Sequence, residues 1–145
     1  MAEIKFDISI ESNVKACKED FNGIMDKVLT MWGMQAESAA KERCPVDTGL
    51  LRNSITWAVA GSGVNSPSYK DNSGEQTGFY QGQAQADVGG ARHVYIGSNV
   101  KYAEVQELGS FNHNAGQESP FLRPGIEDNL DYFREILETE MKNGL

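Results

Sequence analysis

The strongest constraint on the fold of this chain is a helical pattern that runs over residues 13–44 and stops at Pro45. Apolar residues recur there at steps of three and four, as on the buried face of an α-helix. The stripe consists of Val14, Cys17, Phe21, Ile24, Val28, Met31 and Ala39, is interrupted by Gln35, and is widened by Met25, Leu29, Trp32 and Ala36. Because the residue before a proline is disfavoured in helical conformation, the sequence predicts one long helix that ends at Cys44.

The predicted helix is long for a chain of 145 residues, which is one domain's worth of sequence. Unbroken, it would extend about 48 Å at the usual rise per residue. That length exceeds what a compact domain of this size can cover. We therefore expect a single domain over residues 1–145 in which part of the helix packs against another subunit.

Three shorter segments alternate apolar with polar residues, which is typical of half-buried strands. They cover residues 3–10, 50–60 and 92–97. In the second segment, one face is expected to carry Leu51, Ile55, Trp57 and Val59, and the other Arg52, Ser54, Thr56 and Ala58. In the third, Val94 and Ile96 share one face, and His93 and Tyr95 share the other.

The C-terminal part predicts further helix. Residues 100–108 are ambiguous and fit a short helix, and residues 120–124 read as an extended segment between two prolines. Residues 126–142 fit a final helix with the apolar face Ile126, Leu130, Phe133, Leu137 and Met141. We therefore predict an α+β fold, in which a small, mainly antiparallel sheet is packed by a long N-terminal helix and a C-terminal helix.

Residues 61–90 differ from the rest of the chain in composition. They hold 7 of the 15 glycines, with Ser, Asn and Gln between them. A structureless loop of this length is uncommon inside a compact domain. Two interpretations stay open: a hairpin around Phe79 and Tyr80, or a long polar arm that orders on assembly.

The charge is acidic, with 21 Asp and Glu against 13 Lys and Arg, a formal net charge of −8. This balance argues against sequence-specific nucleic-acid binding, which needs clustered cations. Half of the excess lies in residues 125–145, which suits a solvated outer helix face or a surface that repels DNA. We expect no membrane span and no secretory signal, because no apolar run is long enough.

Motifs for catalysis or metal binding are missing from the sequence. The histidines, His93 and His113, lie in no zinc motif, and no phosphate-binding loop or nucleophile elbow occurs. Cys17 and Cys44 would lie about 40 Å apart on one helix, too far for a disulfide, and suit reduced thiols in the cytosol. The remaining catalytic candidates are a carboxylate pair, Glu104 with Glu107, and Cys44 with a histidine partner. A solvated helix face and a helix end explain these residues more simply, so we predict no catalytic residue, cofactor or metal.

Three segments carry a resemblance to a known family. They are Ala39–Ile55 (AAKERCPVDTGLLRNSI), Val100–Ser110 (VKYAEVQELGS) and Pro120–Gly125 (PFLRPG). In this order and spacing, between two helices, they resemble the tail-component family of tailed bacteriophages and prophages, the gene-product-ten-like family. The chain departs from the family pattern at Ser110, where threonine is usual, at Gly125, where alanine is usual, and in the length of residues 61–90.

The resemblance implies a structural protein of the virion neck or tail. Such a protein completes the tail, joins it to the filled head and acts as a ring subunit, commonly six-fold. Its partners would be copies of itself and other neck and tail-tube proteins, with assembly in the host cytoplasm. A ring is compatible with a heterologous interface that closes on itself. The alternatives are a small prophage-encoded hydrolase and a general binding module that uses residues 61–90.

The resemblance also singles out the residues that hold the fold or line the subunit contact. They are Pro45, Asp47, Thr48, Gly49, Leu51, Arg52, Tyr102, Glu107, Gly109, Pro120, Phe121, Leu122, Arg123 and Pro124.

Within this set, physical roles can be predicted from residue type. Asp47 and Gly49 are expected to shape the turn, the first by bonding downstream amides and the second by positive φ. Glu107 is expected to bond backbone, or to pair with Arg52 or Arg123. The prolines would hold an extended segment that inserts Phe121 and Leu122 into the core.

Overall fold

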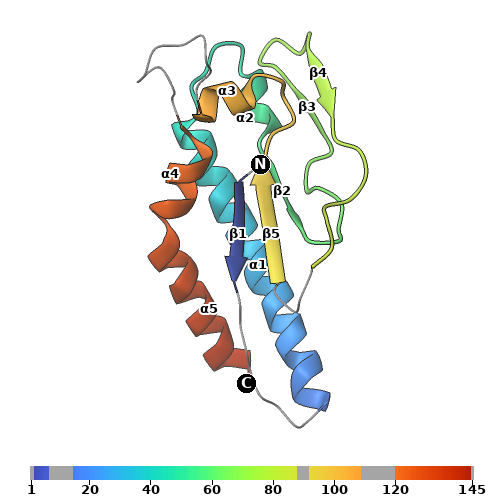
Figure 1. The fold of residues 1–145 in the computed structure, drawn as a ribbon, viewed down its shortest axis with the longest axis vertical. Helices are drawn as coiled ribbons and strands as arrows, with labels where there is room; N and C mark the ends of the chain where they lie inside the picture. The colour runs from blue at the N-terminus through green and yellow to red at the C-terminus, as the bar shows by residue number, and fades with distance from the viewer. Residues whose placement is uncertain (1, 7–14, 88–91, 109–119, 145) are drawn as a thin grey trace.

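The computed structural model describes residues 2–6, 15–87, 92–108 and 120–144, with side chains from Phe21 onward. Its elements are β1 (Ala2–Phe6), α1 (Lys15–Arg43), α2 (Leu50–Ser54), β2 (Thr56–Val59), β3 (Ser68–Lys70), β4 (Thr77–Phe79), β5 (Arg92–Gly97), α3 (Ala103–Leu108), α4 (Leu122–Glu127) and α5 (Leu130–Gly144) (Figure 1). The fold is α+β, as predicted.

The main sheet has β5 at its centre. β5 pairs antiparallel with β1 on one side and with β2 on the other. Trp57 lies opposite Ile96 and Val59 opposite Val94, so these four share the face that packs on α1. A Cβ on Gly33 would stand 2.5 Å from the Trp57 ring, so the glycine lets β2 approach the helix closely. The strand predicted at 92–97 and its two faces are confirmed.

The long helix is confirmed as α1, which begins at Lys15 and ends at Arg43. It packs against β2, β5, α4 and α5. Its buried line consists of Met25, Val28, Leu29, Trp32, Ala36, Ala39 and Ala40. The centre of the buried face is therefore formed by the residues that were predicted only to widen the apolar stripe: Met25, Leu29, Trp32 and Ala36. Met31 and Gln35, predicted at its centre, lie half-buried at its margin.

The strand predicted at 50–60 is wrong over its first half, because residues 50–54 form α2. Gly49 has φ 85°, which reverses the chain, and its carbonyl accepts a hydrogen bond from the Asn53 amide at 2.9 Å, closing a helical turn. Trp57 and Val59 share one face of β2, as predicted, but the opposite face is buried as well. Thr56 and Ala58 are buried more deeply than Trp57, because residues 61–87 cover the face that was expected to be polar.

The extended segment predicted at 120–124 is wrong as well, because α4 begins at Leu122. Pro124 lies in the first turn, where its missing N–H would have no intrahelical partner. The final helix is two helices, interrupted at residues 128–129, where the Asn129 side-chain amide donates to the Gly125 carbonyl at 2.7 Å. α5 buries Phe133 and Ile136, whereas Leu130, predicted to be buried, is exposed.

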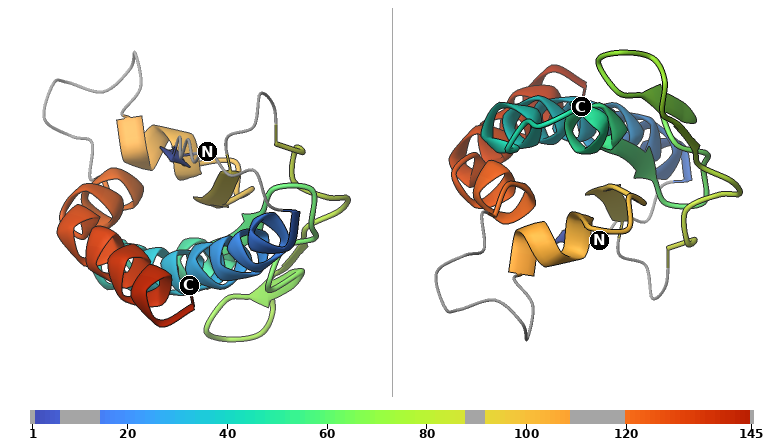
Figure 2. Two further views of the ribbon diagram at one scale, coloured as in Figure 1. Left: turned by 90° about the horizontal axis from the view of Figure 1, so that it is seen from below. Right: turned by 90° about the horizontal axis from the view of Figure 1, so that it is seen from above.

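Residues 61–87 contain the hairpin that was one of the two predictions for this segment. β3 and β4 pair antiparallel, with Ser68 opposite Phe79 and Lys70 opposite Thr77. The hairpin stands on the β2 side of the sheet, while α4 and α5 lie on the opposite side of the molecule (Figures 1 and 2). Among the described helices, none is both long and apolar enough to cross a membrane.

Candidate functional site

The three motif segments, which lie far apart in the sequence, meet at one end of the molecule. The turn after α1, the helices α2 and α3 and the start of α4 all lie at this end (Figure 1). Leu51 and Tyr102, from the first two segments, line the same cleft. The second and third segments are joined by hydrogen bonds from a single side chain, Glu107.

The Glu107 carboxylate accepts hydrogen bonds from consecutive backbone amides at the start of α4. Its Oε2 accepts from the Phe121 amide at 2.7 Å and from the Leu122 amide at 2.9 Å. Its Oε1 accepts from the Arg123 amide at 2.8 Å. These amides have no intrahelical partner, so the carboxylate satisfies donors that would otherwise be left unpaired. Of the roles predicted for Glu107, the bond to backbone is the one observed.

The turn at residues 45–49 is built around Thr48 and Gly49. The Thr48 hydroxyl accepts from the Leu50 amide at 3.3 Å, and the Thr48 carbonyl accepts from the Asn72 amide at 2.8 Å. A Cβ on Gly49 would stand 2.3 Å from Asn72 Oδ1, so the site requires glycine for space as well as for φ. Asp47 is exposed and makes no hydrogen bond within the described residues. The side chain that bonds a downstream amide in this turn is that of Thr48.

The hairpin turn docks on α2 through Asn72. Its Oδ1 accepts from Asn53 Nδ2 at 3.2 Å and from Arg52 Nη2 at 3.4 Å. Asn53 Nδ2 also donates to the Lys70 carbonyl at 2.8 Å. Arg52 therefore contacts the hairpin and not Glu107. The first motif segment provides the surface on which the hairpin docks.

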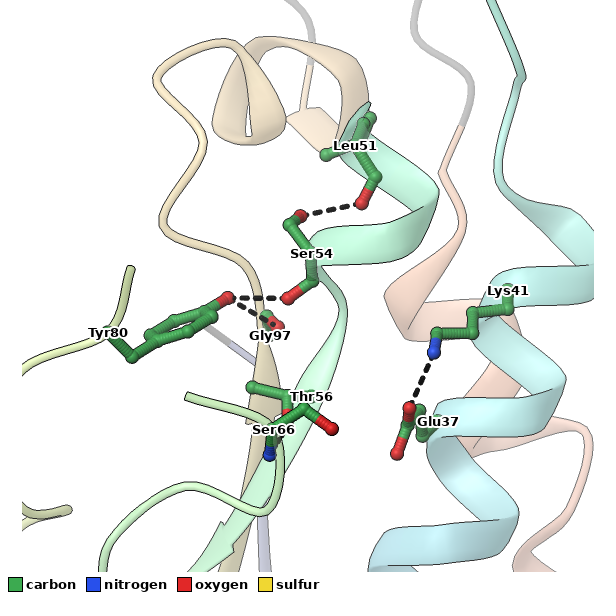
Figure 3. Close-up of polar contacts among 8 residues, drawn as sticks. All are labelled: Glu37, Lys41, Leu51, Ser54, Thr56, Ser66, Tyr80 and Gly97. Atoms are coloured by element: carbon green, nitrogen blue, oxygen red, sulfur yellow. Dashed lines mark hydrogen bonds and ion pairs between the residues drawn. The ribbon is translucent and has the colours of Figure 1, made fainter. Parts of the chain in front are cut away.

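Tyr80 fixes the other end of the hairpin, and it was not among the predicted site residues. Its hydroxyl donates to the Ser54 carbonyl at 2.7 Å, with the Gly97 carbonyl 3.3 Å away (Figure 3). The same hydroxyl accepts from the Asn99 amide at 3.0 Å. Burial raises the pKa of the Tyr80 hydroxyl to about 12. Nearby, the Thr56 hydroxyl accepts from the Ser66 amide at 3.1 Å, while the Glu37–Lys41 ion pair lies apart on α1 (Figure 3). An isolated tyrosine in a polar segment carries no sequence signal for such a contact.

Two clefts flank α3. The smaller, about 420 Å³, is lined by Pro45–Gly49, Leu51, Tyr102 and Gln106. The larger, about 690 Å³, lies between α3 and α4 and includes Val100, Leu108, Leu122 and Ile126. Tyr102, Val105 and Leu108, whose apolar spacing predicts the short helix α3, are exposed, and so is Val46 in the turn after α1.

Glu104 and Glu107 on α3 and Cys44 after α1 are the residues that the sequence offered as catalytic candidates. Both Glu107 oxygens are engaged by backbone amides, and Glu104 is exposed. Burial raises the pKa of the Cys44 thiol to about 11, so the thiol is protonated at neutral pH. His93 lies on β5, where its Nδ1 is 2.9 Å from Asp87 Oδ1. No group of three potential metal ligands occurs in the part of the chain that the structure describes.

The remaining motif residues divide by burial. Leu51, Phe121 and Leu122 are buried in the core, as expected for the last two. Pro45, Pro120 and the Arg123 side chain are exposed, and Pro124 is half-buried. Gly109 lies outside the described residues, as does Ser110.

Comparison with known proteins gives one family. The family model described as "Bacteriophage HK97-gp10, putative tail-component" matches residues 9–109, more than two thirds of the chain. This span includes the first motif segment and nearly all of the second. The searches of curated proteins and of solved structures gave no match.

Proposed function

Since the chain belongs to the HK97-gp10-like family of bacteriophage tail components, we propose that it acts at the head–tail junction as a tail-completion protein. As a tail component it is a protein of the virion. In the proposed role, copies form a ring, commonly six-fold, between the neck and the tail tube. Its partners are then other copies of the chain and neighbouring neck and tail proteins.

The observation that carries the proposal is the convergence of the motif segments at one end. Glu107 joins α3 to the start of α4, and the Asn72 amide joins the hairpin to the turn after α1 through the Thr48 carbonyl. A surface fixed in this way loses little conformational entropy when it binds a partner. It also presents four exposed apolar side chains, Val46, Tyr102, Val105 and Leu108. Clustered exposed apolar residues are typical of protein–protein contacts.

The proposed role is structural and without catalysis. Of the catalytic candidates that the sequence offered, Glu107 is engaged by backbone amides, the Cys44 thiol is protonated, and Glu104 is exposed on α3. The expectation that part of α1 packs against another subunit remains part of the proposal. From Met25 to Ala40, the apolar stripe of α1 is covered by the chain's own sheet and C-terminal helices.

The experiment is a deletion in the phage or prophage that encodes the chain. We expect filled heads and tails to accumulate unjoined, and plasmid-borne protein to restore joined particles. Mass spectrometry and cryo-EM of those particles should find the chain as a ring at the neck. Absence of the chain from purified, infectious virions would overturn the proposal, whereas a monomer in solution would not, since the ring can require the particle.

A further inference from the structure

We propose that the hairpin of one copy inserts Phe79 into the α3–α4 cleft of a second copy of this chain, head to tail. The inference rests on the proposed function, because it names the contact by which the ring subunits would join. The surface that fills the cleft is the outer face of β3 and β4.

The donor surface is an exposed aromatic side chain on a backbone that hydrogen bonds hold in place. Phe79 is 63% exposed, although its neighbours are fixed. Its carbonyl accepts from Asn99 Nδ2 at 2.7 Å, and the Tyr80 amide donates to the Pro67 carbonyl at 2.7 Å. Exposed aromatics on a preorganised backbone are the residues that dominate binding energy at protein interfaces.

The inner face of the hairpin explains why Phe79 points outward. Tyr69 packs over Gly78, where a Cβ would stand 2.2 Å from its ring. The Tyr69 hydroxyl donates to Asn99 Oδ1 at 2.5 Å, and its ring centre lies 5.7 Å from that of Tyr80. Because side chains alternate along a strand, this packing directs Phe79 and Lys70 together to the opposite, exposed face.

The acceptor surface is the cleft of about 690 Å³ between α3 and α4. Its lining includes buried Leu122 and Ile126, half-buried Val100 and exposed Leu108. The volume exceeds what one phenyl ring needs, so neighbouring residues of the hairpin can enter with it. A buried aromatic anchor in an apolar recess with a polar rim is the usual arrangement of an interface core.

The charges of the two surfaces match. The cleft rim carries the carboxylates of Glu104 and Glu127, which have no ion-pair partner within the described residues. Lys70, on the hairpin face with Phe79, is likewise without one. Glu75 at the hairpin turn can face the rim cations Lys101 and Arg123 in the same way. Such pairs fix the orientation of an interface more than they add affinity.

The positions of donor and acceptor favour a closed ring over a symmetric dimer. The hairpin lies on one side of the molecule and α4, which forms one wall of the cleft, on the other (Figures 1 and 2), while Asn99 at the near edge of the cleft donates to the Phe79 carbonyl. A contact between two different surfaces repeats from copy to copy, and it closes when the rotation between copies allows.

The first experiment places a photoreactive benzoylphenylalanine at position 79. Irradiation is performed on assembled particles and on a concentrated mixture of 15N-labelled and unlabelled purified protein. We expect crosslinks from position 79 to residues 100–108 or 122–127, joining labelled to unlabelled chains in the mixture. Crosslinks confined to one chain, or made only to other proteins in the particle, would overturn the inference and leave the proposed function standing. If particles lack the chain, the proposed function fails, and the purified mixture alone decides the inference: no inter-chain crosslink at any concentration overturns it.

The second experiment compares Phe79→Ser with Tyr132→Ser. Tyr132 is also an exposed aromatic residue, at 47%, but lies on α5 and lines no part of the cleft. We expect Phe79→Ser to lower the number of copies per particle by at least roughly tenfold, the scale of a lost interface anchor. Tyr132→Ser should leave it unchanged, and both should melt like the wild type. Equal incorporation of the two variants would overturn the inference.

Discussion

Trp32 on α1 donates its indole N–H to the backbone carbonyl of Phe133 on α5, at 2.8 Å, across 101 positions of sequence. The two rings also pack on each other, with centres 5.8 Å apart. Both side chains are essentially fully buried. The pair therefore joins the N-terminal and C-terminal helices through a polar and an apolar contact at once.

Phe133→Ala should cost about 3–5 kcal/mol of unfolding free energy, because it removes a fully buried ring and leaves a cavity beside Trp32. Urea denaturation followed by tryptophan fluorescence would measure the loss. The matched control is Tyr132→Ala, the exposed neighbour on the same helix, which should change stability by less than about 1 kcal/mol. Similar losses for the two variants would contradict the packing described for α5.

Glu107→Gln should destabilise the protein by about 1–3 kcal/mol, because an amide has one acceptor oxygen where the carboxylate uses two, and its NH₂ faces backbone donors. Glu104→Gln, on the same short helix, removes an equal charge from an exposed position. Thermal melting of both variants in the same buffer isolates the hydrogen bonds from the charge. If Glu104→Gln were as harmful as Glu107→Gln, the contact with the start of α4 would not contribute to stability.

Gly49→Ala should cost more than Gly61→Ala, although both glycines have positive φ, 85° and 80°. Alanine in this conformation costs about 1–2 kcal/mol at either site. At Gly61 a Cβ meets nothing within 4 Å, whereas at Gly49 it collides with the Asn72 side chain. Chemical denaturation of the two variants therefore separates backbone strain from the loss of hairpin docking. Equal costs would mean that Asn72 moves aside freely.

High pH should weaken the fold through Tyr80. Its pKa is raised to about 12 by burial, above the ordinary value of 10.0, so the folded state holds the proton more tightly than the unfolded state does. The stabilisation is present below pH 10 and is lost as the pH rises toward about 12. Tyr80→Phe should flatten this decline in stability, whereas Tyr132→Phe, at an exposed position, should not. Spectrophotometric titration of phenolate absorbance, with stability measured in parallel, provides the test.

The elements that could be predicted from the sequence are those whose periodicity reports burial directly. The apolar repeat before Pro45 predicts α1, and the alternation of Val94 and Ile96 with His93 and Tyr95 predicts β5 and its faces. In both cases one element meets one face of the core, so spacing along the chain is sufficient.

The wrong predictions share a physical cause in long-range contacts. The spacing of Leu51 and Ile55 also fits a strand, and only the turn at Gly49 makes residues 50–54 helical. Pro124 predicts an extended segment from sequence alone. The residues around it are helical because the Glu107 carboxylate accepts hydrogen bonds from the first amides of α4. Tyr80 meets Ser54 from 26 positions away, which no local pattern contains.

The bonds from Glu107 to the amides of Phe121 and Leu122 have a practical consequence for labelling. They hold the end of α3 against the start of α4, whatever the length of chain that connects them. Doubling the number of residues between two joined points costs only about 0.6 kcal/mol in closure entropy. An epitope tag or a small fluorescent reporter inserted between residues 110 and 120 should therefore leave both helices in register and allow the chain to be followed inside infected cells.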